Sequence, residues 1–497
     1  MGLAKFFLIP STGVMAIPIS LMSLNTEIDD EIVLATYQSY INADIADQAF
    51  NDYSLKTIYF ENDKEVFNGF ASGAFDLAIL SSSTLEEAIS KNLAKKIDWK
   101  KFKSIQSKLG NGGTSNEGIS KKLGQIYSPV VSKFFENAPE LANYGIPYFI
   151  SYFAFAYRGK PLEGSSSTET TTVRPNSTLS EPSQKTPMSW YELMQKISKD
   201  DRFKSKEGEP KLGMVEDELT LFSLSKLSNK TAGSNNSSEI EQLFKKEETT
   251  SEDDFYKQYI QINESGINKE VLGERPLFFS PDSVVLSEAL SSGNLQGIFF
   301  YNGDALYAHQ MLEEEKEESE EESEEETINV VPLSPALWFL DSIVISSKSS
   351  PEKEEGIYQF LEKLSFENFD KFEKLNRKQE LSGEETDNKD TKEEKRPEWL
   401  LGNFTEIGYT PVLQEFNKWI KGEKTNPPSP APEGDGDFYK KEKEFLYGEP
   451  DMEKCLEGLK QKKEANEKNC FVVFERGLND SQNLNLALAF ERWKNNF

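Results

Sequence analysis

Short apolar runs alternate with mixed, more polar stretches in the first part of the chain after residue 30. The apolar runs at residues 31–40, 54–60 and 76–80 predict strands, whereas the stretches at 42–51 and 63–71, and one beginning at Thr84, predict helices. Strands that alternate with helices at this spacing are typical of a parallel sheet covered by helices. Because ligands bind such sheets at the carboxyl ends of the strands, Tyr37, Tyr40 and Ser81 become candidate binding residues.

A later apolar run carries one charge where none is expected. Residues 334–346 read SPALWFLDSIVIS, and this β-branched run predicts a buried strand that contains Asp341. Burying a carboxylate without a partner costs several kcal/mol, so Asp341 needs a compensating group. Phe339 lies two positions earlier and therefore points to the same face of the strand. We expect this face to pair a carboxylate with an aromatic ring.

Length and charge narrow the classes of function. The 497 residues allow two or three domains, and the formal net charge is -29, with 85 acidic against 56 basic residues. A polyanionic partner needs a basic face, so nucleic acid is not a predicted ligand, whereas a cation is. Part of the charge lies in the Glu-rich block at 312–327, which we predict to be a solvated, mobile loop. Other polar insertions are expected near 160–187, 229–254, 378–396 and 422–436.

The first 25 residues are mainly apolar, with Lys5 as their one charged residue. They predict a signal sequence or a membrane anchor, and we favour an uncleaved anchor with the rest of the chain on the extracellular face of the cell membrane. This segment contains no cysteine, so no lipid attachment is predicted there. The two cysteines, Cys455 and Cys470, form either a local disulfide or two thiols. With His309 as the one histidine, neither a metal site, nor a cofactor, nor an enzymatic role is expected.

Eight segments in unbroken order resemble the substrate-binding proteins of ABC importers, most closely the spermidine/putrescine-binding family. They are YQSY (37–40), AFDLAILSSS (74–83), IPYFISYFAFAYRG (146–159), SWYEL (189–193), EDELTLF (216–222), GNLQGIFFYNGDA (293–305), ALWFLDSIVIS (336–346) and IGYTPVL (407–413). Each motif is weak alone, and their common order makes the resemblance specific. It implies a bilobal, periplasmic-binding-protein-like α/β fold, with lobe 1 at 26–149 and 336–410 and lobe 2 at 150–335 and 411–497.

The resemblance also implies a function and a site. Such a protein closes on a diamine or polyamine and presents it to the permease subunits of a transporter, which have their own ATPase. Carried over position by position, the ligand-binding residues are the aromatic Tyr37, Tyr40, Tyr301, Phe339 and Tyr409, the acidic Asp217, Asp304 and Asp341, and Ser81. In the C-terminal region, where the match is looser, Glu475 or Arg476 can approach the cleft. The chemistry fits, because carboxylates bind ammonium groups and aromatic faces attract cations by roughly 0.5–2 kcal/mol per contact.

Structural roles remain open for these residues. Tyr37 and Tyr40 can cap a core, Asp217 and Asp304 can cap helices, Tyr409 can serve a turn, and Asp341 can form a salt bridge between lobes. Two other functions also remain. The chain can be a surface antigen or adhesin that has kept the bilobal fold without a solute, or a receptor for thiamine, another organic cation or a carbohydrate.

Overall fold

The computed structural model describes residues 31–38, 40–60, 63–110, 116–162, 188–228, 251–319, 327–331, 333–367, 369, 398–420, 445–446 and 472–496. The predicted N-terminal anchor, both cysteines and most of the predicted insertions lie outside these ranges. Within them, no helix combines the length and the apolar character needed to cross a bilayer.

The first three strands form the parallel, helix-covered sheet that the sequence predicts. In chain order the elements are β1 (Ile32–Thr36), α1 (Ala43–Tyr53), β2 (Leu55–Tyr59), α2 (Asp63–Ser72), β3 (Leu77–Ser81) and α3 (Ser82–Ser90). Strand β1 lies between β2 and β3 and is parallel to both. Helix α3 begins two residues before the predicted Thr84, because the side chain of Ser81 accepts a hydrogen bond from the Thr84 amide and so caps the helix.

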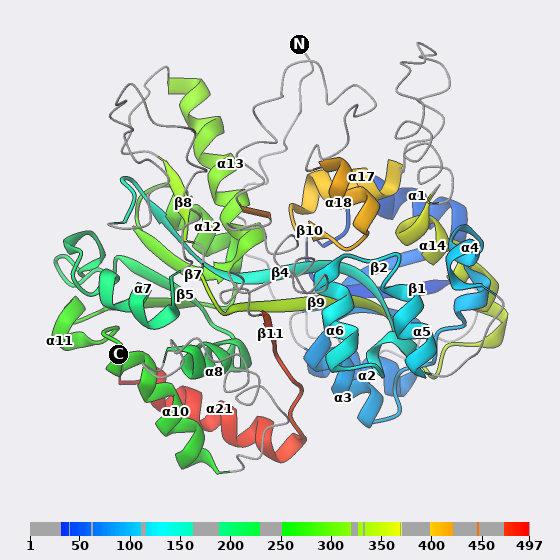
Figure 1. Ribbon diagram of the computed structural model, residues 1–497, viewed down its shortest axis with the longest axis horizontal. Coiled ribbons are helices and arrows are strands. Elements are labelled where there is room, and N and C mark those ends of the chain that lie inside the picture. Colours follow the sequence, from blue (N-terminus) through cyan, green and yellow to red (C-terminus); the bar gives the residue numbers. More distant parts are fainter. Residues whose placement is uncertain are drawn as a thin grey trace, which may run out of the picture.

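Two long strands, β4 (Gly145–Arg158) and β9 (Ala336–Ile345), run through the centre of the molecule (Figure 1). They are antiparallel to each other, and β9 also pairs with β3. On the other side, β4 pairs with β7 (Gly297–Tyr301), which leads to β5 (Leu212–Val215) and β6 (Leu277–Ser280). The full order is β2-β1-β3-β9-β4-β7-β5-β6. The predicted α/β class is therefore confirmed, and β4 and β9 connect the two groups of parallel strands.

Helices and short strands complete both sides of the sheet. The helices are α4 (Gln106–Leu109), α5 (Asn116–Leu123), α6 (Pro129–Asn137), α7 (Trp190–Ile197), α8 (Glu218–Leu227), α10 (Glu252–Glu264), α11 (Lys269–Leu272), α12 (Ser283–Ser291), α13 (Asn302–Ser319), α14 (Glu354–Phe366), α17 (Glu398–Ile407), α18 (Gln414–Ile420) and α21 (Asp480–Lys494). The short strands are β8 (Ile328–Val330), β10 (Thr410–Pro411) and β11 (Val472–Phe474).

One prediction about the insertions is wrong in part. The Glu-rich block was expected to be a loop from residue 312, yet α13 continues through Ser319. Glutamate is a good helix former, and the block follows directly on an established helix, so elongation needs no new nucleus. Residues 320–326 lie outside the described ranges.

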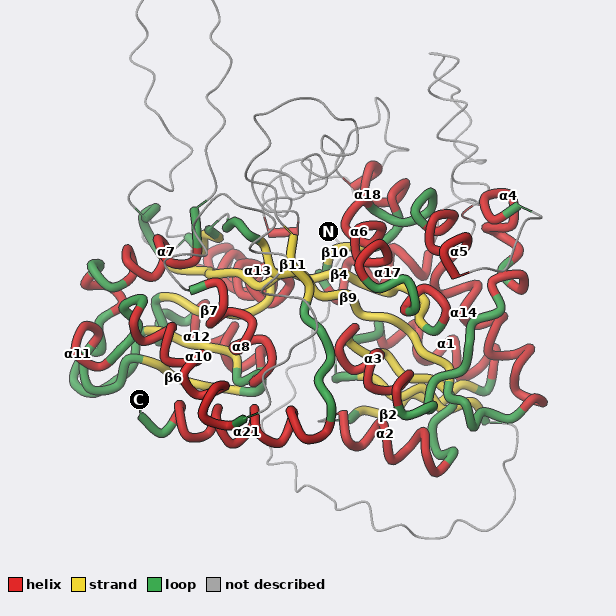
Figure 2. The backbone as a smooth tube through the Cα atoms, turned by 60° about the horizontal axis from the view of Figure 1, so that its bottom comes forward, coloured by secondary structure: helices red, strands yellow, loops and turns green. Residues whose placement is uncertain are grey.

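The C-terminal segment joins both groups of strands. Strand β11 pairs in parallel with β9, and α21 follows it beneath α10 (Figure 2). At its start, Asp480 forms an ion pair of 2.9 Å with Lys91, which directly follows α3. Near its end, Trp493 Nε1 donates a hydrogen bond of 2.6 Å to Asn263 of α10. Helix α21 therefore contacts α10 on one side of the molecule and Lys91, at the end of α3, on the other.

Candidate functional site

Strand ends from both halves of the molecule converge on one face of β9. Strand β3 ends at Ser81, which lies opposite Asp341 in the sheet register. Strand β7 ends at Tyr301, whose ring lies 5.2 Å from that of Phe339 in an edge-to-face arrangement. Nine of the ten residues of β9 are buried, and Asp341 is the exception at half-buried. The carboxylate predicted to be buried therefore lies at the margin of the core.

Asp341 has a phenol as a partner. Tyr40 Oη donates a hydrogen bond to Asp341 Oδ2. Burial raises the pKa of Tyr40 well above its usual value, and the neighbouring charge of Asp341 raises it further, so the phenol keeps its proton. The ring of Tyr40 lies 5.9 Å from that of Tyr37 and 5.5 Å from that of Tyr409. Three of the predicted aromatic residues thus gather beside this carboxylate.

Asp304 extends the same cluster. It lies in the first turn of α13, and its carboxylate accepts hydrogen bonds from Tyr409 Oη at 3.1 Å and from Ser283 Oγ at 2.9 Å. Burial raises the pKa of Asp304 to about 6, although both hydroxyl donors act to lower it. Tyr409 therefore connects Asp304 to the aromatic residues around Tyr40. This contact is additional to the role in a turn that was considered for Tyr409.

Asp217 has two roles at once. Its Oδ1 accepts a hydrogen bond of 2.9 Å from the Thr220 amide, which makes it the N-cap of α8, as the structural alternative predicted. Its Oδ2 accepts a second bond, of 3.3 Å, from Tyr301 Oη. Burial and the charge of Asp217 both raise the pKa of Tyr301 well above its usual value. Asp217 is therefore both a helix cap and a member of the cluster, which it joins through Tyr301, whose ring packs on Phe339.

A fourth carboxylate, Glu475, was expected, with Arg476, only to approach the cleft and was given no ligand-binding role. It follows β11, has only 5% of its surface exposed, and accepts hydrogen bonds from Ser83 Oγ at 3.3 Å and Ser223 Oγ at 3.4 Å. Burial raises its pKa well above the usual value, and the charge of Asp217 raises it further. The apolar run FVVF before Glu475 is the signal that could have marked it, because it places the carboxylate at a strand end.

Ser81 lies at the edge of this region rather than inside it. Its hydroxyl caps α3 and lies 3.0 Å from Ser83 Oγ and 3.0 Å from Thr84 Oγ1. Ser83 in turn donates to Glu475. The structure therefore places Ser81 in a serine-rich helix start that is joined to the acidic cluster.

Hydroxyl groups dominate the surroundings of these acids. In the part of the chain that the structure describes, no lysine or arginine pairs with Asp217, Asp304 or Glu475, whose partners are hydroxyls and one backbone amide. The described ranges also contain no group of acidic, histidine or cysteine side chains suited to a metal ion. The cluster combines carboxylates, phenols and an apolar ring, a set that suits an organic cation better than an anion.

The central crossing strands, the two groups of parallel strands and the surrounding helices define an α/β fold of the periplasmic-binding-protein type. The chain itself belongs to the family described as hypothetical lipoprotein (MG045 family), whose model matches residues 5–485. No curated protein matches the chain.

Solved structures of transport proteins are similar over most of the chain at low identity. PotD, the substrate-binding protein of a spermidine/putrescine ABC transporter from Streptococcus pneumoniae, is 12% identical, with 94% of this chain and 99% of that chain covered and a TM-score of 0.48. AgtB from A. tumefaciens, solved with agropinic acid, is 10% identical, with coverage of 95% and 99% and a TM-score of 0.44. The lipoprotein Tp0655 (TpPotD) of Treponema pallidum is 14% identical, with coverage of 70% and 83% and a TM-score of 0.40.

Proposed function

We propose that this protein is the extracytoplasmic binding component of an ABC importer and that its solute is a polyamine such as spermidine or putrescine. The observation that carries the proposal is the hydroxyl-bonded set of carboxylates, Asp217, Asp304, Asp341 and Glu475, at converging strand ends. Burial opposes ionisation of Asp304 and Glu475, and an ammonium group would offset that cost.

The aromatic residues supply the second half of this recognition. Polyamine nitrogens are separated by methylene chains, which need apolar walls between the carboxylates. Tyr37, Tyr40 and Tyr409 provide one such wall, and Tyr301 with Phe339 provides another. A neutral solute would leave Asp217, Asp304 and Glu475 without a cationic partner among the described residues, so this site disfavours carbohydrates.

Delivery and location complete the proposal. The solute would pass to permease subunits driven by their own ATPase, and the apolar segment at 1–25 would tether the protein to the outer face of the membrane. The family description as a lipoprotein supports a tether, although residues 1–25 contain no cysteine to carry a lipid. The bilobal division at 26–149 and 336–410 against 150–335 and 411–497 would let the site close around the solute.

Equilibrium binding of the full-length protein tests the proposal. We expect spermidine or putrescine to bind and to compete with each other, and thiamine to bind more weakly or not at all. Tight binding of thiamine alone would assign another organic cation to the site. A protein that binds neither polyamines nor thiamine would fit the surface antigen or adhesin instead.

A further inference from the structure

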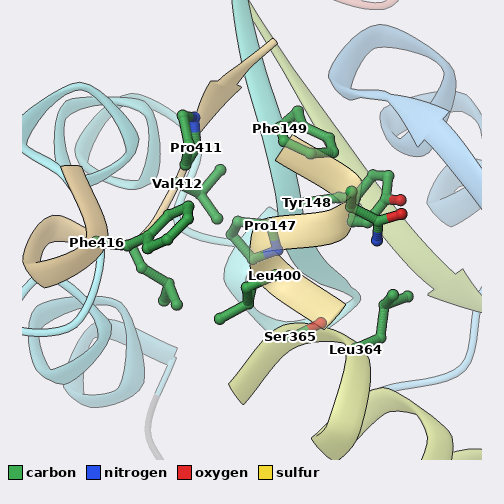
Figure 3. Close-up of a pocket in the computed structure, with 11 residues that line it drawn as sticks. Pro147, Tyr148, Phe149, Leu364, Ser365, Leu400, Pro411, Val412 and Phe416 are labelled. Atoms are coloured by element: carbon green, nitrogen blue, oxygen red, sulfur yellow. The ribbon is translucent and has the colours of Figure 1, made fainter. Parts of the chain in front are cut away.

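A cavity of about 20 Å³ lies among β4, α14, α17 and the segment around β10 (Figure 3). Most of its lining is apolar, with Pro147 and Phe149 on β4 and Leu364 on α14. Tyr148, Ser365 and Asn403 also line it. A space of this size holds one water molecule, because about 10–15 Å³ open to the centre of a water suffices.

Two buried polar atoms at this cavity lack a hydrogen-bond partner. Ser365 and Asn403 are 6% and 2% exposed, and within the described ranges neither Ser365 Oγ nor Asn403 Nδ2 is bonded to another group. Leaving such a group unsatisfied costs roughly 1–3 kcal/mol, and buried waters commonly satisfy such groups. The cavity therefore combines the size and the polar groups that a single water needs.

The cavity wall also holds the loop that carries Tyr40. Tyr148 Oη donates a hydrogen bond of 3.1 Å to the Tyr40 carbonyl oxygen. Asn403 Oδ1 accepts one of 2.9 Å from the Asn42 amide. These two bonds hold the backbone between β1 and α1 on both sides of Ile41. The loop that brings Tyr40 to Asp341 is thus fixed by two side chains of the cavity.

We propose that the cavity is a binding site for one water molecule, which bridges Asn403 Nδ2 and Ser365 Oγ, and that Tyr148 and Asn403 are positioning residues for Tyr40. The water accepts a hydrogen bond from the Asn403 amide and bonds to the Ser365 hydroxyl. The water holds the Asn403 side chain with its Oδ1 toward the Asn42 N–H. If the Asn403 amide were flipped, its NH2 group and the Asn42 N–H would be two donors facing each other. The effect on solute binding rests on the proposed function, whereas the water and the geometry of Tyr40 do not.

The test uses the full-length protein labelled with carbon-13 at tyrosine Cζ, with the Tyr40 resonance assigned through Tyr40→Phe. We expect Tyr148→Phe to shift that resonance, since the hydrogen bond to Asp341 changes when the loop moves, and to weaken spermidine binding about tenfold. Tyr358→Phe is the matched control: Tyr358 Oη accepts a bond of 2.7 Å from the Asp98 amide, away from the Tyr40 loop, so the Tyr40 resonance should stay in place.

A high-resolution crystal structure provides the second measurement. We expect a water within hydrogen-bonding distance of Asn403 Nδ2 and Ser365 Oγ in the wild type, and its loss in Ser365→Ala. An unchanged Tyr40 resonance in Tyr148→Phe, or no electron density for a water at this place, would overturn the inference. If the resonance shifts and the water is present while the wild type binds no polyamine, the proposed function fails and the positioning role stands.

Discussion

The carboxylate of Asp304 gives a prediction that needs no knowledge of the solute. Burial raises its pKa from 3.8 to about 6, so the folded protein binds a proton more tightly than the unfolded chain does. Stability is therefore lost as pH rises from about 4 to 6, and the loss is complete above the folded pKa. At 1.36 kcal/mol per pKa unit, ionisation costs about 3 kcal/mol at pH 7.5 and about 1.6 kcal/mol at pH 5.

The variant Asp304→Asn removes this cost while keeping the shape of the side chain. Its amide can still accept a hydrogen bond from Ser283 and can donate one to Tyr409. In urea unfolding of the ligand-free protein, this variant should be more stable than the wild type, with an advantage about 1.4 kcal/mol larger at pH 7.5 than at pH 5. Asp44→Asn, at an exposed position in α1, is the control and should change little. Equal effects of Asp304→Asn at both pH values would refute the reasoning.

Three further substitutions test other parts of the site. Asp341→Asn should weaken spermidine binding at least tenfold in calorimetry, or about 1.4 kcal/mol, without lowering the melting temperature of the unliganded protein; a lower melting temperature with normal affinity would assign Asp341 a purely structural role. Glu475→Gln should raise the melting temperature at pH 7.5, because a carboxyl with a raised folded pKa costs stability once the pH exceeds the pKa of the unfolded chain, and should weaken binding; a fall in melting temperature would contradict this. Gly477→Ala should destabilise the protein by about 1–3 kcal/mol in urea, because the new Cβ would lie 2.6 Å from the Ser83 carbonyl oxygen, and an unchanged midpoint would show that the C-terminal segment can shift freely.

Local patterns were sufficient to predict four strands of the sheet. The runs that contain β1, β2 and β9 are rich in β-branched and aromatic residues, and β3 lies in a short apolar run, so all four strands follow from the sequence. The start of α3 was harder to predict than the strands, because three successive serines offer several possible N-caps. The structure uses Ser81. The helical part of the Glu-rich block was not predicted, because the prediction rested on charge repulsion alone. In the structure, the helix propensity of glutamate prevails through Ser319.

The site was harder to predict than the fold because its bonds join distant positions. Asp341 could be singled out, since a charge within an apolar strand is unusual, but nothing local to the sequence indicated Tyr40 as its hydrogen-bond partner. Glu475 bonds to Ser83, 392 positions earlier, and to Ser223, 252 positions earlier. Such contacts depend on the complete topology, in particular on β11 pairing with β9.

Isothermal titration of the full-length protein with spermidine at pH 7.5 tests the central claim most directly. We predict saturable binding of one solute per chain, which weakens at pH 5 because protonation of Asp304 removes a negative charge from the site. Absence of binding to spermidine, spermine and putrescine at millimolar concentration would contradict the claim that this acidic and aromatic cluster is a polyamine site.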